Sequence, residues 1–85
     1  MKFSLDDIIA AMRSSDYKER LVAEYALTQR RYNALHQLIV QYEAGTLTFT
    51  PDCPLDLLKK QEKAMGDYLY CLEVRAEIEK IALAG

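Results

Sequence analysis

The side chains that most often carry enzyme chemistry are scarce in this 85-residue chain, and they are not grouped. His36 is the single histidine, and Cys53 and Cys71 are the two cysteines. A catalytic nucleophile needs a base beside it, and a structural zinc ion needs paired cysteine or histidine ligands. Local spacing supplies neither a Cys–His pair, nor a Ser–His–acid set, nor a metal site. We therefore expect no enzyme activity, no metal and no cofactor, and we interpret His36 as half-buried or exposed.

The segment from Arg13 to Arg20 has a composition that suits phosphate. It places two hydroxyls, an aromatic ring and three cations at the start of an expected helix, where free backbone N–H groups attract anions. Tyr17 could stack on a base. Asp16 and Glu19 would repel an anion, so the alternative interpretation is a helix junction with caps and surface ion pairs.

Six tyrosines and no tryptophan are a second signal. Buried tyrosines need hydrogen-bond partners, so they indicate either an amphipathic core, an interface between subunits, or a wet pocket of Tyr and Arg. A pocket of that kind would suit a nucleotide, because rings stack on bases and guanidinium groups bind phosphates. The candidate ligand-binding residues from both signals are Tyr17, Lys18, Arg20, Tyr25 and Arg75.

Two long helices must position these residues. Leu58, Met65 and Leu72 recur every seven residues in the segment 54–82, which is typical of a helix packed along its length on another helix. In the segment 16–44 the residues of the expected packing face recur at alternating intervals of three and four. A short helix is expected at about 4–13, because Ser4 and Asp7 have the spacing of a capping box.

The connector 45–53 joins the long helices and sets their direction. Gly45 suits a left-handed C-cap, and Pro54 is expected in the first turn of the next helix, with Asp52 or Cys53 as its cap. A short connector predicts antiparallel packing. If the position numbers in each layer sum to one hundred, Tyr25 meets Arg75. The fold class is therefore all-α: a single domain (1–85) formed by an antiparallel hairpin with a short N-terminal helix.

Size and charge narrow the functional classes. A core this small is marginal, which favours a homo-oligomer. The net charge is −2 with both signs interspersed, so duplex nucleic acid is not an expected partner. No apolar run is long enough for a membrane span, and the N-terminus does not have the pattern of a signal peptide. Two isolated cysteines then indicate free thiols in a cytoplasmic protein.

Two blocks carry a family resemblance: MRSSDYKERLVAEY near the start and CPLDLLKKQEKAMGDYLYCLEVRAEIE near the end. In them the chain resembles small phage and prophage proteins known as crAss-phage-related. The resemblance implies a phage product that acts in the cytosol of a bacterial host. Small helical phage proteins of this kind often counter host immunity, and some form oligomers that sequester nucleotide second messengers.

Two functional hypotheses follow. The first is a non-enzymatic anti-defence protein that sequesters a host nucleotide signal, such as a cyclic nucleotide or an ADP-ribose derivative. The alternative is a helical interaction module that inhibits or adapts a host or phage protein by packing an apolar face into its groove.

Overall fold

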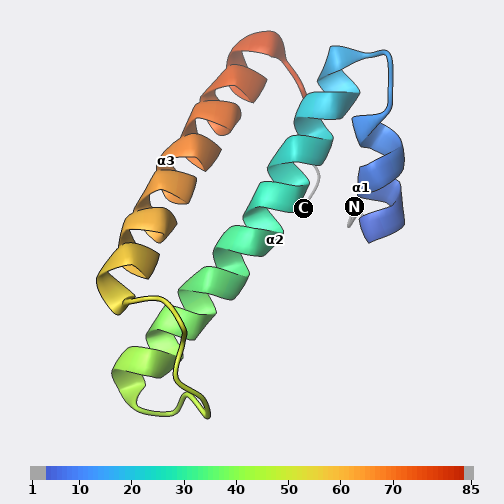
Figure 1. The fold of residues 1–85 in the computed structure, drawn as a ribbon. Helices are drawn as coiled ribbons and strands as arrows, with labels where there is room; N and C mark the ends of the chain where they lie inside the picture. Colours follow the sequence, from blue (N-terminus) through green and yellow to red (C-terminus); the bar gives the residue numbers. More distant parts are fainter. Residues whose placement is uncertain (1–3, 84–85) are drawn as a thin grey trace.

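The computed structural model describes residues 4–83, which form three α-helices and confirm the all-α prediction. The helices are α1 (Leu5–Met12), α2 (Tyr17–Ala44) and α3 (Leu55–Glu79). As Figure 1 shows, α2 and α3 run side by side in opposite directions, and α1 lies against the first part of α2 on the side away from α3. The antiparallel hairpin brings the start of α2 next to the end of α3.

The beginnings of α1 and α2 follow the sequence signals. Ser4 and Asp7 form the expected capping box: the Asp7 N–H donates to the Ser4 hydroxyl at 3.1 Å, and the Ser4 N–H donates to the Asp7 carboxylate at 3.2 Å. Asp16 caps α2 by accepting from the Lys18 N–H at 3.0 Å. Each cap satisfies backbone donors that a helix start leaves without partners.

The connector ends α2 as predicted and begins α3 differently. Gly45 has φ +76°, the left-handed conformation that glycine adopts without a Cβ penalty. Pro54 is the N-cap of α3, with ψ 145°, rather than a first-turn residue, and no side chain caps this helix. The prediction that Asp52 or Cys53 would cap α3 is therefore wrong. The carbonyl of Pro54 accepts from the N–H groups of Leu57 and Leu58, which begins the helix directly after the proline.

The end of α3 also differs from the expected boundary near residue 82. Lys80 takes the left-handed conformation, with φ 57°, and the Ile81 N–H donates to the Ala76 carbonyl at 2.8 Å. This closes the helix at Glu79. Ile81 and Leu83 then turn back onto the hairpin core instead of continuing the helix. The physical reason is that the two apolar side chains gain burial against α2 that a straight helix would not give them.

The core lies in the seam between the two long helices. Leu21, Tyr25, Leu69 and Leu72 form its buried cluster. Cross-helix pairs fix the register: Tyr25 contacts Glu73, His36 contacts Glu62, and Glu43 contacts Lys59. Each of these pairs lies within two positions of the predicted layer. The expected pairing of Tyr25 with Arg75 is wrong, because the register is shifted by two positions here: Tyr25 meets Glu73 on α3, and Arg75 bonds to Glu79 in its own helix.

A smaller contact holds α1 in place. Ile8 is 1% exposed and is the buried residue of α1, and Ala23 on α2 is fully buried. A small residue on α2 lets a neighbouring helix approach closely. The short helix is stable because it buries Ile8, since a helix of this length is marginal alone.

Candidate functional site

The candidate site is the end of the hairpin where α2 begins, α3 ends and the C-terminal segment turns back. Tyr17, Lys18 and Arg20 belong to the first turn of α2, and Arg75 lies one turn before the end of α3. Antiparallel packing brings these two regions together although they are almost sixty positions apart in the sequence. Tyr25 lies two turns further along α2, in the core.

Glu79 joins two of the predicted residues. Its carboxylate accepts from the Arg75 guanidinium at 3.2 Å and lies near the Tyr17 hydroxyl. The hydrogen bond from Tyr17, followed by that from Arg75, lowers the pKa of Glu79. Reciprocally, the hydrogen bond to Glu79 raises the pKa of Tyr17. The cluster of Tyr17, Arg75 and Glu79 thus holds an ionised carboxylate between a neutral phenol and a guanidinium.

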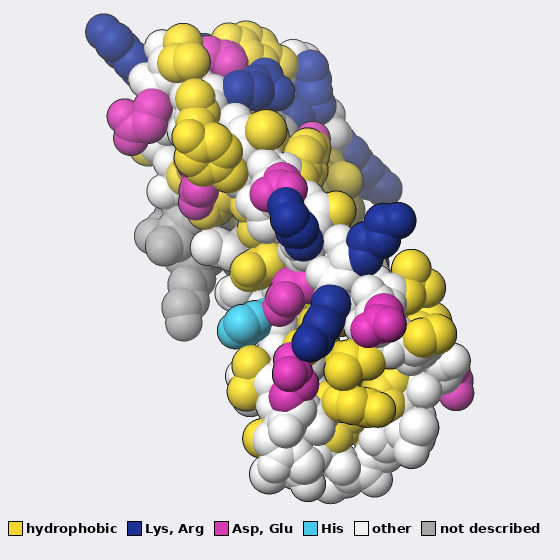
Figure 2. All heavy atoms as spheres, turned by 90° about the vertical axis from the view of Figure 1, so that its left-hand side faces the viewer, with side chains coloured by type: hydrophobic (Ala, Val, Ile, Leu, Met, Phe, Trp, Pro, Cys, Tyr) yellow, Lys and Arg dark blue, Asp and Glu magenta, His cyan; other side chains and the backbone are white. Residues whose placement is uncertain are grey.

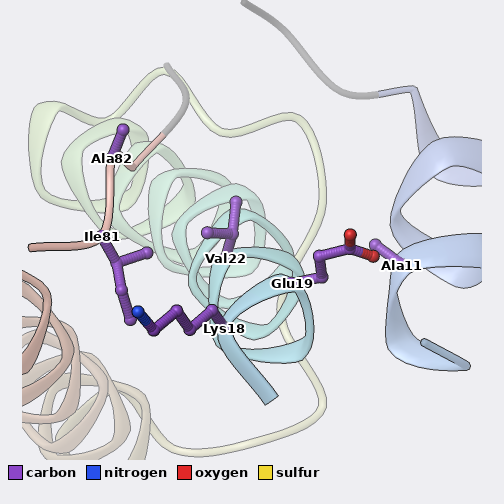
Figure 3. A pocket seen from close by; sticks show the side chains of 6 residues that line it. All are labelled: Ala11, Lys18, Glu19, Val22, Ile81 and Ala82. Carbon is purple, nitrogen blue, oxygen red and sulfur yellow. The ribbon is translucent and has the colours of Figure 1, made fainter. Parts of the chain in front are cut away.

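A cavity of about 360 Å³ lies beside this cluster. Its lining comes from α1, α2 and the C-terminal segment that follows α3: Ala11, Lys18, Glu19, Val22, Ile81 and Ala82. Figure 3 shows the Lys18 side chain extending along the cavity toward Ile81, whereas Glu19 points toward Ala11 on α1. The cavity therefore combines apolar walls with one ammonium and one carboxylate group at its sides.

Arg20 and the residues at the start of α2 form hydrogen bonds within the chain. The Arg20 guanidinium donates to the Ser14 carbonyl at 2.7 Å, and the Ser14 hydroxyl accepts from the Asp16 N–H at 3.1 Å. The Asp16 carboxylate already accepts from the Lys18 N–H. These contacts are those of a capped helix junction, with the Asp16 carboxylate placed where an anion would otherwise bind.

Tyr25 is a core residue at a distance from the cavity lining. Its hydroxyl donates to the Glu73 carboxylate at 2.7 Å and accepts from the Gln29 side chain at 3.4 Å. Burial, together with the hydrogen bond to Glu73, raises the pKa of Tyr25 to about 12. This geometry gives Tyr25 a role in joining α2 to α3.

A second cavity, of about 440 Å³, lies on the other side of the C-terminal segment. It shares Ile81 and Ala82 with the first cavity, but Glu73 and Glu77 contribute to its walls. Two carboxylates would repel a phosphate. The first cavity, which has Lys18, is therefore the better candidate for an anionic ligand.

Sequence reasoning did not identify Glu79 and Ile81 as parts of this site. The spacing of Arg75 and Glu79, four residues apart on one helix, is a signal for an ion pair and could have identified Glu79. Ile81 had no comparable signal, because its position depends on the left-handed turn at Lys80.

The remaining candidate groups lie elsewhere. His36 contacts Glu62 at 2.6 Å and stacks on Tyr32, with ring centroids 6.1 Å apart. Both cysteines are exposed free thiols. Between residues 4 and 83, no group of three or more His, Cys, Asp or Glu side chains could hold a metal ion. None of the described helices combines the length and the apolar character that crossing a membrane requires.

Comparison with known proteins identifies one family. Neither curated proteins nor solved structures give a match to the chain. Residues 15–78, by contrast, match the family described as Sequestin. The matched region contains nearly all of α2 and α3 and hence the helices that carry Tyr17, Lys18 and Arg75. Because the match spans well over half of the chain, this protein belongs to the Sequestin family.

Proposed function

We propose that this protein is a non-enzymatic phage anti-defence protein that binds a host nucleotide immune signal in the bacterial cytosol and sequesters it. The signal would be a cyclic nucleotide or an ADP-ribose derivative. The observation that carries the proposal is the Sequestin match, whose name is consistent with a sequestering role and whose residues include Lys18, Glu19 and Val22, the part of the cavity lining that α2 supplies.

The cavity supports a ligand with an apolar part and an anionic part. Its volume of about 360 Å³ falls within the range of small-molecule pockets, which is roughly 300–1,000 Å³. Val22 and Ile81 provide apolar surface for a base, and the Lys18 ammonium can neutralise a phosphate. Tyr17 lies at the start of the same helix and is half-exposed, so its ring is accessible for stacking.

One chain offers few cations for such a ligand. Lys18 is the single basic residue of the cavity lining, Arg20 bonds to the Ser14 carbonyl, and Arg75 pairs with Glu79. A nucleotide with two phosphates would need further positive charge. We therefore include a homo-oligomer in the proposal, so that a second chain completes the site.

Calorimetric titration with a panel of cyclic mononucleotides, cyclic dinucleotides and ADP-ribose derivatives tests the proposal. We expect one class to bind at micromolar protein or below, and to be recovered unchanged after release, as sequestration without catalysis requires. Lys18→Glu should weaken binding about tenfold or more by placing a carboxylate beside the phosphate.

The matched control is Arg31→Glu, a charge reversal on α2 outside the cavity lining. Arg31 is exposed, so its substitution should leave the affinity within about twofold. Absence of binding by every compound in the panel, or equal losses in the two variants, would contradict the proposal.

The alternative function, a module that binds another protein, also has an observation in its favour. Leu5, Ile9 and Met12 are each about half-exposed on α1, which gives this short helix an apolar outer side. Such a side suits insertion into a groove. A stable protein partner that is lost in Ile9→Glu, with no nucleotide bound, would favour this alternative.

A further inference from the structure

Helix α3 carries two rows of residues at helical spacing, and only one of them is buried against α2. The first faces α2 and consists of partly or fully buried residues: Leu58, Met65, Leu69, Leu72 and Ala76. The second lies beside it, repeats at alternating intervals of four and three, and is exposed at every position. We call it the outer stripe, and it consists of Leu57, Gln61, Ala64, Tyr68, Cys71, Arg75 and Ile78.

The outer stripe exposes large apolar side chains along the whole helix. Leu57 is 53% exposed, Tyr68 44% and Ile78 74%, and the stripe extends for about 32 Å at 1.5 Å per residue. Single exposed apolar residues are ordinary, but Leu57, Ala64, Cys71 and Ile78 repeat every seven residues, which is typical of a helix that packs on another helix. Figure 2, which shows the side of the molecule that α3 occupies, has hydrophobic side chains gathered toward both ends with charged groups between them.

The order of residue types in the outer stripe is the same in both directions. From either end it contains a large apolar residue, a polar residue, a small residue and then the central Tyr68. A two-fold axis through Tyr68 therefore places Leu57 opposite Ile78 of the partner subunit, and Ala64 opposite Cys71 of the partner subunit. It also places Arg75 opposite Gln61 of the partner subunit, whose amide oxygen can accept from the guanidinium. This self-complementarity is what a symmetric contact between identical chains requires.

The charges of α3 favour the antiparallel direction. In residues 55–67 three lysines balance three carboxylates, whereas residues 68–79 contain three glutamates and one arginine, a net charge of −2. Parallel packing would place the two negative halves against each other. Antiparallel packing places each negative half against a neutral half of the other helix.

The amount of exposed surface is sufficient for such a contact. The chain exposes 6232 Å², whereas a compact monomer of this mass would expose about 5,200 Å². The excess of roughly 1,000 Å² exceeds the ~800 Å² that each partner buries in a standard stable interface. The radius of gyration, 15.0 Å against about 12 Å expected for this length, shows the same excess.

We infer that a second copy of this chain covers the outer stripe, with the two α3 helices antiparallel about a two-fold axis at Tyr68. The inference concerns assembly and does not depend on the nucleotide of the proposed function. It specifies how two chains of the proposed homo-oligomer pack on each other, and it can be tested without any ligand.

Sedimentation of the ligand-free full-length chain tests the surface. The wild type should sediment as a dimer or a multiple of one at micromolar concentration, and Tyr68→Glu should weaken the association about tenfold or more, because two carboxylates would meet on the axis. Tyr70→Glu is the matched control, since Tyr70 is 66% exposed on α3 but lies outside the outer stripe. Far-UV circular dichroism checks that both variants keep their helices. A monomeric wild type, or equal association of the two variants, would overturn the inference.

Disulfide formation tests the direction and does not rely on a disruptive variant. In a Cys53→Ser background, Ala64→Cys places a thiol opposite Cys71 of the partner subunit. Mild oxidation should give a covalent dimer whose peptide map joins position 64 to position 71. Disulfides that join position 64 to 64 or 71 to 71 would show parallel packing, and the absence of a covalent dimer would show no contact here. Either result overturns the inference.

Discussion

At the scale of single residues, Tyr25 connects the two long helices through a buried phenol. Its ring belongs to the core cluster, and its hydroxyl donates to Glu73 on α3. Glu73 is exposed, so the hydrogen bond reaches from the core to the surface. Ionisation of Tyr25 would place a negative charge in the seam next to a carboxylate. The stability of the hairpin therefore depends on keeping this phenol protonated.

We predict that ionisation of Tyr25 lowers the stability of the hairpin at high pH. Its pKa is about 12 in the folded protein and 10 in the unfolded chain, so between these values the folded state binds more protons and the free energy of unfolding falls as pH rises. At pH 8 the wild type should exceed Tyr25→Phe by about 1 kcal/mol, the value of a hydrogen bond. That difference should decrease between pH 10 and 12.

Urea denaturation of both proteins from pH 8 to 11.5 measures this difference. All ionisable groups other than Tyr25 are common to both proteins, so their contributions cancel in the comparison. A difference that stays constant over this range would mean that Tyr25 does not control the alkaline loss.

Gly66 and Tyr32 form a second contact at this scale. A Cβ on Gly66 would lie 3.3 Å from the Tyr32 ring, which is itself stacked on His36. Gly66→Ala should therefore change the free energy of unfolding by less than about 0.5 kcal/mol, since the helix propensity gained is offset by displacement of the ring. In a Tyr32→Ala background the same change should stabilise by about 1 kcal/mol.

A double-mutant cycle by chemical denaturation checks this coupling. Equal effects of Gly66→Ala in the two backgrounds would show that the ring of Tyr32 moves aside without cost.

At the scale of elements, the ends of the helices decide where the C-terminal segment lies. Lys80 adopts the left-handed conformation at the end of α3, and Ile81 and Leu83 reach the core because of this turn. A residue with a Cβ pays about 1–2 kcal/mol for that conformation. The burial of the two apolar side chains offsets this cost. The same turn places Ile81 in the wall of the candidate cavity.

Lys80→Gly should raise the free energy of unfolding by about 0.5–1 kcal/mol, because glycine adopts φ 57° without a Cβ clash but loses more entropy on folding. Glu77→Gly is the control in the last turn of the same helix, and it should lower stability by up to about 1 kcal/mol. Thermal and urea unfolding measure both. A destabilised Lys80→Gly variant would indicate that the Lys80 side chain contributes more than its backbone strain costs.

At the scale of the whole molecule, one seam holds the long helices together. Leu72 is 2% exposed and lies in its buried cluster. Leu72→Asp should abolish folding at 25 °C, because an unpaired buried carboxylate costs several kcal/mol and a small domain has little stability to lose.

The control, Tyr70→Asp, makes the same kind of change at an exposed position two residues away and should cost less than about 1 kcal/mol. Circular dichroism and sedimentation distinguish the variants. Wild-type helicity in Leu72→Asp would mean that the seam does not depend on this residue.

Periodicity and capping signals in the sequence predicted much of this architecture. Apolar residues at intervals of three, four and seven predict the two long helices, because those intervals keep side chains on one helical face. Ser4 with Asp7 and Gly45 identify helix ends by local hydrogen bonding and by backbone freedom. Antiparallel packing and an approximate register then follow from the short connector. They bring the start of α2 near the end of α3, which is where four of the five predicted site residues lie.

Only the tertiary structure decided how that end of the hairpin is built. It paired Tyr25 with Glu73 and turned Ile81 back at Lys80 to line a cavity with Lys18. The sequence by itself determined the helices, because their periods and caps are local properties that a short window contains. The partners of each polar side chain depend on competition among groups distant in the sequence, which is settled by burial and geometry when the helices pack.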